Sequence, residues 1–151
     1  MLDDTDRRLL RLLLDDPSLP TAELAARAGL TSATCWRRIE RMTAAGVIRG
    51  QRAVIDWRRL GYEVEVSLRF TLDKTDPRAF DDFIAAAREV PEVLAIETFL
   101  GRVDVRLNVI ARDMAHWQEI YRHRILTLPH IAEIDALMLV GKIHETEGLP
   151  L

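Results

Sequence analysis

The 151-residue chain has very little cysteine: Cys35 is the single one, so no disulfide within the chain and no cysteine-rich zinc site is possible. It also lacks an apolar run approaching the ~20 residues that a membrane-spanning helix needs. The first residues, Leu2 to Asp6, are acidic, whereas a secretory signal peptide starts with basic residues. These absences exclude a disulfide-stapled secreted protein and argue against any membrane partner, and we expect a cytoplasmic location.

Motifs of catalysis and metal binding are scarce as well. The sequence contains no glycine-rich phosphate loop, no serine nucleophile elbow and no paired-histidine metal motif. His116 and His123 are seven residues apart and could share a helix face, but a metal site needs further ligands. We therefore predict that the protein is not an enzyme and has no catalytic residue, no metal site and no cofactor.

The composition is that of an ordinary globular protein, with 48% hydrophobic and 30% charged residues and a net charge of −3. The charge is unevenly distributed. Residues 1–60 carry 11 basic and 8 acidic residues, whereas residues 61–151 carry 10 basic and 16 acidic residues. Six of the arginines lie between Arg27 and Arg52. This asymmetry predicts that the basic N-terminal part binds a polyanion and that the acidic C-terminal part does not.

Helical periodicity predicts three helices in the front half. The first runs from about Asp4 to Asp16. Thr21 is the expected cap of a second helix over 22–28, which Gly29 ends. Thr31 or Ser32 caps a third helix that runs to about Ala45, with Cys35, Ile39 and Met42 as its buried stripe. Two short helices joined by a tight glycine turn are typical of a helix-turn-helix, whose second helix enters the major groove of double-stranded DNA.

The DNA-binding residues that this layout predicts are hydroxyl, aromatic and arginine side chains at or after the start of the third helix. Hydroxyls and arginines suit base edges and phosphates. A β-rich ribbon over 47–56, turning at Gly50, would act as a small wing that contributes two more arginines. A three-helix bundle with a solvated arginine face is the alternative. The predicted residues are Ser32, Thr34, Trp36, Arg37, Arg38, Arg41, Arg49 and Arg52.

The back half alternates between strands and helices. The segment 62–72 places Val64, Val66 and Leu68 on one face and polar residues on the other, as a strand with one buried face does. The order β-α-β-β-α-β is that of the ferredoxin-like fold, an α+β class with an antiparallel sheet and two helices on one face. The further elements are a helix from Asp76-Pro77 to Glu89, strands over 93–100 and 103–111, a helix capped by Asp113, and a strand over 131–140.

The sheet face without helices is expected to be mixed in character. Apolar Ala95, Phe99 and Leu137 stand there beside charged Glu97 and Arg106. An uncovered face of this kind favours self-association, and we predict a dimer formed sheet to sheet.

Several stretches resemble the Lrp/AsnC family of feast/famine transcription regulators. Residues 2–10, LDDTDRRLL, resemble the start of the family's first helix, and AELA at 22–25 with GLT at 29–31 resembles its second helix and turn. RRIERM at 37–42 followed by GVI at 46–48 resembles the recognition helix and its exit. AVID at 53–56 with Leu60-Gly61 resembles the linker strand, and GRVD at 101–104 resembles the family's effector turn.

This resemblance implies a winged helix-turn-helix over 1–50, a linker strand over 51–61 and a ferredoxin-like effector and oligomerisation domain over 62–151. It also implies homodimers that assemble into tetramers or octamers, and control by a small effector, commonly an amino acid. The chain departs from the family at Arg102, where an acid or amide is usual, at Val103, where an aromatic residue is usual, and at Ala136, where many members carry threonine.

From these positions we predict an effector site beside the turn from Leu100 to Asp104. The backbone of Gly101 lets a carboxylate approach closely. Arg102 adds a positive charge, and Asp104 could hold an ammonium group. The predicted effector-binding residues are Leu100, Gly101, Arg102, Val103, Asp104, Ala136 and Met138.

Three other functions are compatible with parts of the sequence. Siroheme decarboxylases share the two-part architecture, but the strand 103–110 offers no histidine for a tetrapyrrole cleft. A stand-alone small-molecule-binding module would not need the arginine-rich front half. An architectural DNA-binding protein without an effector would be consistent with the altered turn at Arg102 and Val103.

Overall fold

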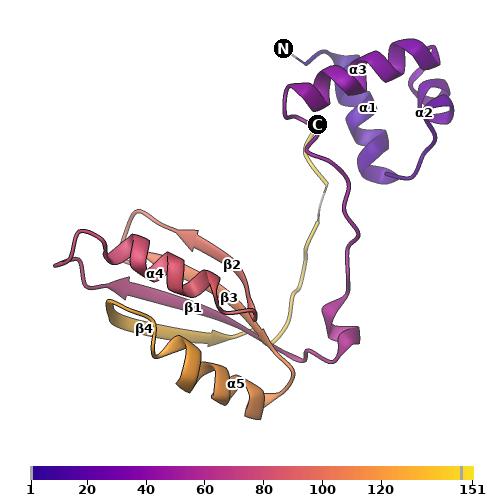
Figure 1. Cartoon of the computed structure of the whole chain (residues 1–151). Helices are drawn as coiled ribbons and strands as arrows, with labels where there is room; N and C mark the ends of the chain where they lie inside the picture. Colours follow the sequence, from indigo (N-terminus) through magenta and orange to yellow (C-terminus); the bar gives the residue numbers. More distant parts are fainter. Residues whose placement is uncertain (1, 147) are drawn as a thin grey trace. The chain divides into compact units, whose positions relative to one another are not determined.

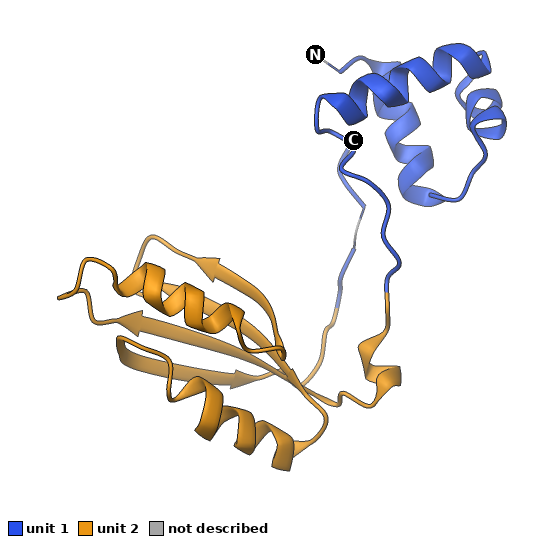
Figure 2. Cartoon of the chain, in the orientation of Figure 1, with its two compact units in different colours: residues 1–54, 144–151 blue, residues 55–143 orange. Residues whose placement is uncertain are grey.

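The computed structural model describes residues 2–146 and 148–151, and the chain divides into two compact units (Figure 2). The first unit comprises residues 1–54 and 144–151, and the second comprises residues 55–143. In the described part of the chain, no helix has the length and apolar character needed to cross a membrane.

The first unit consists of α1 (Asp4–Asp15), α2 (Thr21–Ala28) and α3 (Ser32–Ala44) (Figure 1). A capping box starts α1: the Asp6 N–H donates to Asp3 Oδ1 at 2.8 Å, and the Asp3 N–H donates to Asp6 Oδ2 at 3.1 Å. The apolar faces of the helices form a small core. Its fully buried members are Leu9, Leu24, Ala25, Ala28, Cys35 and Met42.

The second unit has the predicted ferredoxin-like fold. Its chain order is β1 (Val64–Leu72), α4 (Ala79–Arg88), β2 (Val93–Thr98), β3 (Val105–Ala111), α5 (Met114–Ile120) and β4 (Ile131–Met138). A 3₁₀ turn, η1 (Trp57–Leu60), precedes β1, and a π turn, η2 (Tyr121–Ile125), continues α5. The strands form one antiparallel sheet in the order β2-β3-β1-β4, and both helices cover the same face (Figure 1). The α+β prediction is confirmed.

Alternation along β1 decides which side chains reach the core. Val66, Leu68 and Phe70 point under the helices and are fully buried, and the Phe70 ring packs on Phe83 of α4 with centroids 4.8 Å apart. The odd-numbered residues face the open side of the sheet. There Arg69 lies opposite Asp135 of β4 on one side and opposite Arg106 of β3 on the other.

Three local predictions are wrong: the cap of α2, the ribbon over 47–56 and the linker strand over 51–61. Thr21 is the first residue of α2 and does not cap it, because Pro20 occupies the cap position and offers no side-chain hydrogen bond. The β-rich ribbon over 47–56 and the linker strand over 51–61 contain no strand. A strand needs a partner for its backbone hydrogen bonds, and within the described residues no segment pairs with this stretch.

The compact units of the structure divide the chain differently from the domains that the sequence predicts, and the domain bounds stay a prediction. Residues 144–151, assigned to the second domain by the sequence, belong to the first unit. The Arg11 guanidinium on α1 donates two hydrogen bonds, of 2.9 and 2.7 Å, to the Leu151 carbonyl. The chain therefore returns to the helical unit after β4 (Figure 2).

Candidate DNA interface and effector pocket

The connection between α2 and α3 is a tight three-residue turn. Gly29 has φ 70°, in the left-handed region, and ends α2 as predicted. The Leu30 N–H donates to the Ala25 carbonyl at 2.8 Å, which closes the end of the helix. Thr31 then caps α3, because its hydroxyl oxygen accepts the Thr34 N–H at 3.2 Å. This is the local geometry of a helix-turn-helix, with α3 as its second helix.

The outer face of α3 presents Ser32, Trp36 and Arg37 to solvent. The Trp36 side chain is 55% exposed, which is unusual for the largest apolar residue in a unit with so small a core. Arg37 makes only a long 3.5 Å contact with the Thr34 hydroxyl among the described residues. Its guanidinium is therefore available to a base edge or a phosphate.

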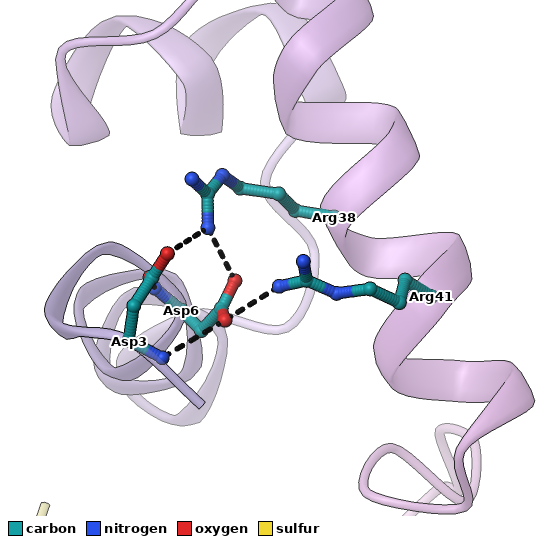
Figure 3. A network of polar contacts seen from close by, with 4 residues as sticks. All are labelled: Asp3, Asp6, Arg38 and Arg41. Carbon is teal, nitrogen blue, oxygen red and sulfur yellow. Dashed lines mark hydrogen bonds and ion pairs between the residues drawn. The ribbon is translucent and has the colours of Figure 1, made fainter. Parts of the chain in front are cut away.

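Arg38 and Arg41 are engaged in a network with α1 (Figure 3). Arg38 Nη1 donates to Asp3 Oδ2 at 2.7 Å and to Asp6 Oδ1 at 2.8 Å. Arg41 Nη2 donates to Asp6 Oδ2 at 2.6 Å. The Asp6 side chain is completely buried. The hydrogen bond from Arg38 holds the pKa of Asp3 below its usual value, and the two carboxylates raise the pKa of Arg38.

This network ties both predicted DNA-binding arginines to α1, although the Arg41 side chain is still 56% exposed and that of Arg38 is 25% exposed. Their contact with DNA stays a prediction. Residues three apart share one side of a helix, and here that side faces the start of α1. The sequence contains both halves of the signal, the Asp3–Asp6 capping box and the two arginines, but nothing in it links residues more than 30 positions apart. Cys35 belongs to the same helix and is buried, and this burial raises the pKa of its thiol.

Arg49 and Arg52 lie in the irregular segment after α3, and both are exposed. In the part of the chain that the structure describes, neither guanidinium has a hydrogen bond or ion pair. They remain candidates for phosphate contacts, but they are carried by an irregular segment and not by a wing.

The turn between β2 and β3 holds the first group of predicted effector residues. Leu100 is fully exposed, Gly101 has a positive φ of 152°, and Val103 is half-buried. The Thr71 hydroxyl donates to the Arg102 carbonyl at 3.2 Å and so fastens the turn to β1.

Asp104 is buried in the fold, with 3% exposure. Its Oδ2 accepts the Leu72 N–H at 2.9 Å, and its Oδ1 pairs with Lys74 Nζ at 2.8 Å. Burial acts to raise the pKa of this carboxyl, but the hydrogen bonds from Lys74 and Leu72 outweigh it and hold the pKa below its usual value. Both oxygens are used within the domain, so the expected role as a ligand for an ammonium group does not fit this geometry.

A pocket of about 280 Å³ lies beside the turn, on the side of β1 and β4. Of the predicted effector residues, Arg102 and Val103 line it. The other contributions come from the adjacent strands and include two acids and a second arginine that the sequence reasoning missed. The full lining is Arg69, Phe70, Thr71, Arg102, Val103, Glu133, Ile134 and Asp135.

The pocket combines two positive with two negative side chains. Among the residues that the structure describes, Arg69, Arg102, Glu133 and Asp135 form no hydrogen bond or ion pair through their side chains, although Arg69 and Asp135 are cross-strand neighbours. Unpaired charges of both signs around a hollow of this size suit a small zwitterion.

Ala136 and Met138 do not line this pocket. They pair with Leu68 and Val66, whose side chains point under the helices, so Ala136 lies on the helix-covered side of β4. Met138 lines another hollow, of about 370 Å³, around Ser67 and Asn108. The assignment of these two residues as effector-binding therefore stays a prediction, and this pocket does not include them.

The open sheet face has the mixed character that the sequence predicted. Leu137 and Leu139 are 38% and 36% exposed, and the Arg106 guanidinium stacks over the Phe99 ring. Near them the buried Glu65 accepts hydrogen bonds from Asn108 at 3.2 Å and from Arg58 at 3.3 Å. The face therefore combines an apolar rim with satisfied polar groups.

Both halves of the chain match known protein families. Residues 2–49 match a family described as winged helix-turn-helix DNA-binding, and residues 65–149 match the Lrp/AsnC ligand binding domain. The DNA-binding transcriptional activator DecR of Escherichia coli K12 is 30% identical over 100% of this chain and 99% of its own length. The proline dehydrogenase transcriptional activator of Rhodobacter capsulatus is 32% identical, covering 96% and 94% of the two chains.

Solved structures agree with this placement. A transcriptional regulator from Neisseria meningitidis in complex with L-Met has a TM-score of 0.90 and 25% identity, covering 99% of this chain and 97% of its own. An AsnC family transcriptional regulator from Agrobacterium tumefaciens has a TM-score of 0.88 and 31% identity, with the same coverage.

Proposed function

Because the chain belongs to the Lrp/AsnC family of transcriptional regulators, we propose that it binds specific sites on double-stranded DNA and that this binding responds to a small zwitterion, such as an amino acid. The observation that carries the proposal is the pocket whose four charged side chains have no partner among the described residues. The relatives are named as regulators, and one solved relative is a complex with L-Met.

The pocket supports a specific mode of effector binding. The guanidinium of Arg102, on the turn, meets the effector carboxylate, and Asp135 of β4 meets its ammonium group. Two charged groups at fixed separation select a zwitterion over a simple acid or amine, because either of the latter leaves one protein charge unpaired. Arg69 and Glu133 remain to recognise the effector's side chain.

A second copy of the chain is the proposed cover of the open sheet face. Leu137, Leu139 and Phe99 are 38%, 36% and 42% exposed, and apolar side chains gathered on an uncovered sheet face favour association with another chain. A two-fold dimer would also present two recognition helices to successive major grooves, about one helical turn apart. Larger assemblies, tetramers or octamers, would be built from such dimers.

Arg37→Ala is expected to weaken binding to a specific duplex by about 1–3 kcal/mol, because Arg37 is the recognition-helix arginine whose guanidinium is not engaged with acids. The duplex is selected by the protein from a random pool, and fluorescence anisotropy compares it with a scrambled duplex. Arg122→Ala, an exposed arginine of the second unit, is the matched control and leaves binding unchanged. Equal affinities for wild type and Arg37→Ala would contradict the assignment of α3.

Among the amino acids, at least one is expected to raise the melting temperature of the full chain and to change its affinity for the selected duplex by about 5–150-fold. Arg102→Ala and Asp135→Asn should each abolish that response, because each removes one pole of the zwitterion site. Glu119→Gln, an exposed acid on α5, is the control. If every amino acid leaves wild type unchanged, or if the two variants respond as wild type does, the effector assignment is wrong and DNA binding is independent of an effector.

A further inference from the structure

A cluster of metal-ligating side chains lies in the second unit, at the end of the sheet where β1 leads to α4 and where β4 begins (Figure 1). Asp76 lies between β1 and α4, Asp82 lies in the first turn of α4, and His130 directly precedes β4. One ligand atom from each residue lies within 4.8 Å of the other two. None of the three is part of the DNA interface or the effector pocket.

The surrounding backbone holds these three side chains together. His130 Nε2 is 3.2 Å from Asp82 Oδ2, which joins the turn before β4 to α4. The Asp73 N–H donates to the His130 carbonyl at 2.8 Å, so the same turn is also fixed to the end of β1. The Arg78 N–H donates to Asp76 Oδ1 at 2.8 Å and leaves Asp76 Oδ2 available. Two segments distant in sequence, residues 76–82 and the turn at His130, are thus brought to one point before any ion is added.

The charge at this point is poorly compensated. Two carboxylates face one imidazole, and the nearest cation in the described structure is the Arg78 Nε, 3.9 Å from Asp76 Oδ1 on a side chain that is 76% exposed. The ligand side chains are 37%, 41% and 24% exposed for Asp76, Asp82 and His130, so an ion can reach them from solvent.

We propose that Asp76, Asp82 and His130 bind one divalent transition-metal ion of the Zn²⁺ class. One imidazole nitrogen and two carboxylate oxygens are donors that Zn²⁺ accepts, and the two carboxylates balance its charge. Ligand atoms on a tetrahedral Zn²⁺ lie about 3.3–3.6 Å apart. The Nε2–Oδ2 separation of 3.2 Å is already close to this, and a rotation of the Asp76 side chain brings in the third ligand. Mg²⁺ and Ca²⁺ prefer larger, all-oxygen ligand sets and are disfavoured here.

The ion would fasten the start of β4 to α4. Residues 133–135 of that strand line the effector pocket, only three to five positions after His130. Ion binding would therefore restrain the strand that supplies Asp135. This consequence requires the proposed effector site, whereas ion binding itself does not.

Titration of ZnCl₂ into untagged, EDTA-treated full-length protein, followed by calorimetry, tests the proposal without DNA or effector. One ion per chain is expected, with Mg²⁺ and Ca²⁺ giving no comparable heat. Asp82→Asn and His130→Asn should each weaken Zn²⁺ binding about tenfold or more. Asparagine is a fair replacement at position 130, because His130 has φ 64° and asparagine tolerates left-handed backbone.

Asp81→Asn and His123→Asn are the matched controls, since both are exposed and neither is in the cluster. They should bind Zn²⁺ as wild type does. Circular dichroism verifies that the variants fold, and the visible absorption of bound Co²⁺ gives an independent report on the imidazole ligand in wild type and Asp76→Asn. If wild type and His130→Asn give the same isotherm and the same Co²⁺ spectrum, the cluster holds an adventitious ion only and the proposal is overturned.

Discussion

Replacing Arg38 and Arg41 together by alanine is expected to destabilise the first unit by about 3–5 kcal/mol. The double substitution leaves the Asp6 carboxylate, which has no solvent exposure, without its two charged partners. A buried charge without compensation costs far more than an exposed ion pair contributes. Since the first unit has a core of only a few apolar side chains, a loss of this size unfolds much of the population.

A further variant tests whether this loss of stability comes from the unpaired Asp6 carboxylate or from the shortening of the two arginine side chains. Adding Asp6→Asn to the double variant removes the buried charge, and most of the lost stability should return. Arg37→Ala lies on the same helix outside the network and should leave stability unchanged. Hydrogen exchange of the full chain, read on peptides of α1 and α3, measures the first unit separately from the second. Equal protection in the double variant and wild type would show that the Figure 3 network is dispensable.

Asp104→Ala is expected to destabilise the second unit by about 2–3 kcal/mol. It should not change which effector is bound, because Asp104 does not line the pocket. The substitution leaves the buried Leu72 N–H at the end of β1 without a hydrogen-bond acceptor and removes the ion-pair partner of Lys74. Asp104→Asn should cost less, because an amide oxygen still accepts the N–H bond. Asp135→Asn is the opposite case, with unchanged stability and a lost effector response, since Asp135 is exposed and unpaired among the described residues.

The pH dependence of Asp104 follows from the direction of its shift. Its pKa in the folded chain is lowered, so its contribution to stability is complete above the ordinary carboxyl value of about 3.9. That contribution is lost as the pH falls below this value and through the lowered folded pKa. Urea denaturation of wild type and Asp104→Asn at neutral pH and near pH 3 should therefore give stability curves that converge in acid. A difference that is constant with pH would contradict the carboxylate's role.

The sequence by itself determined the architecture. Period-3.6 patterns separated α1, α2 and α3, and Gly29 with Thr31 marked the turn between the last two, because left-handed backbone and side-chain caps are local requirements. Strict alternation over 64–72 identified β1 and its buried face in the same way. The fold class and the helix-turn-helix depend on interactions between residues close in sequence, and these can be predicted from the sequence alone.

Side-chain partners across the chain were decided only by the tertiary structure. Asp6 with Arg38 and Arg41, Asp104 with Leu72 and Lys74, and the gathering of Asp76, Asp82 and His130 each join residues that no local pattern connects. Charged side chains look alike in a sequence whether they face solvent, a ligand or one another. Their roles depend on which surfaces the packed core brings together, and that is a property of the whole fold rather than of any segment.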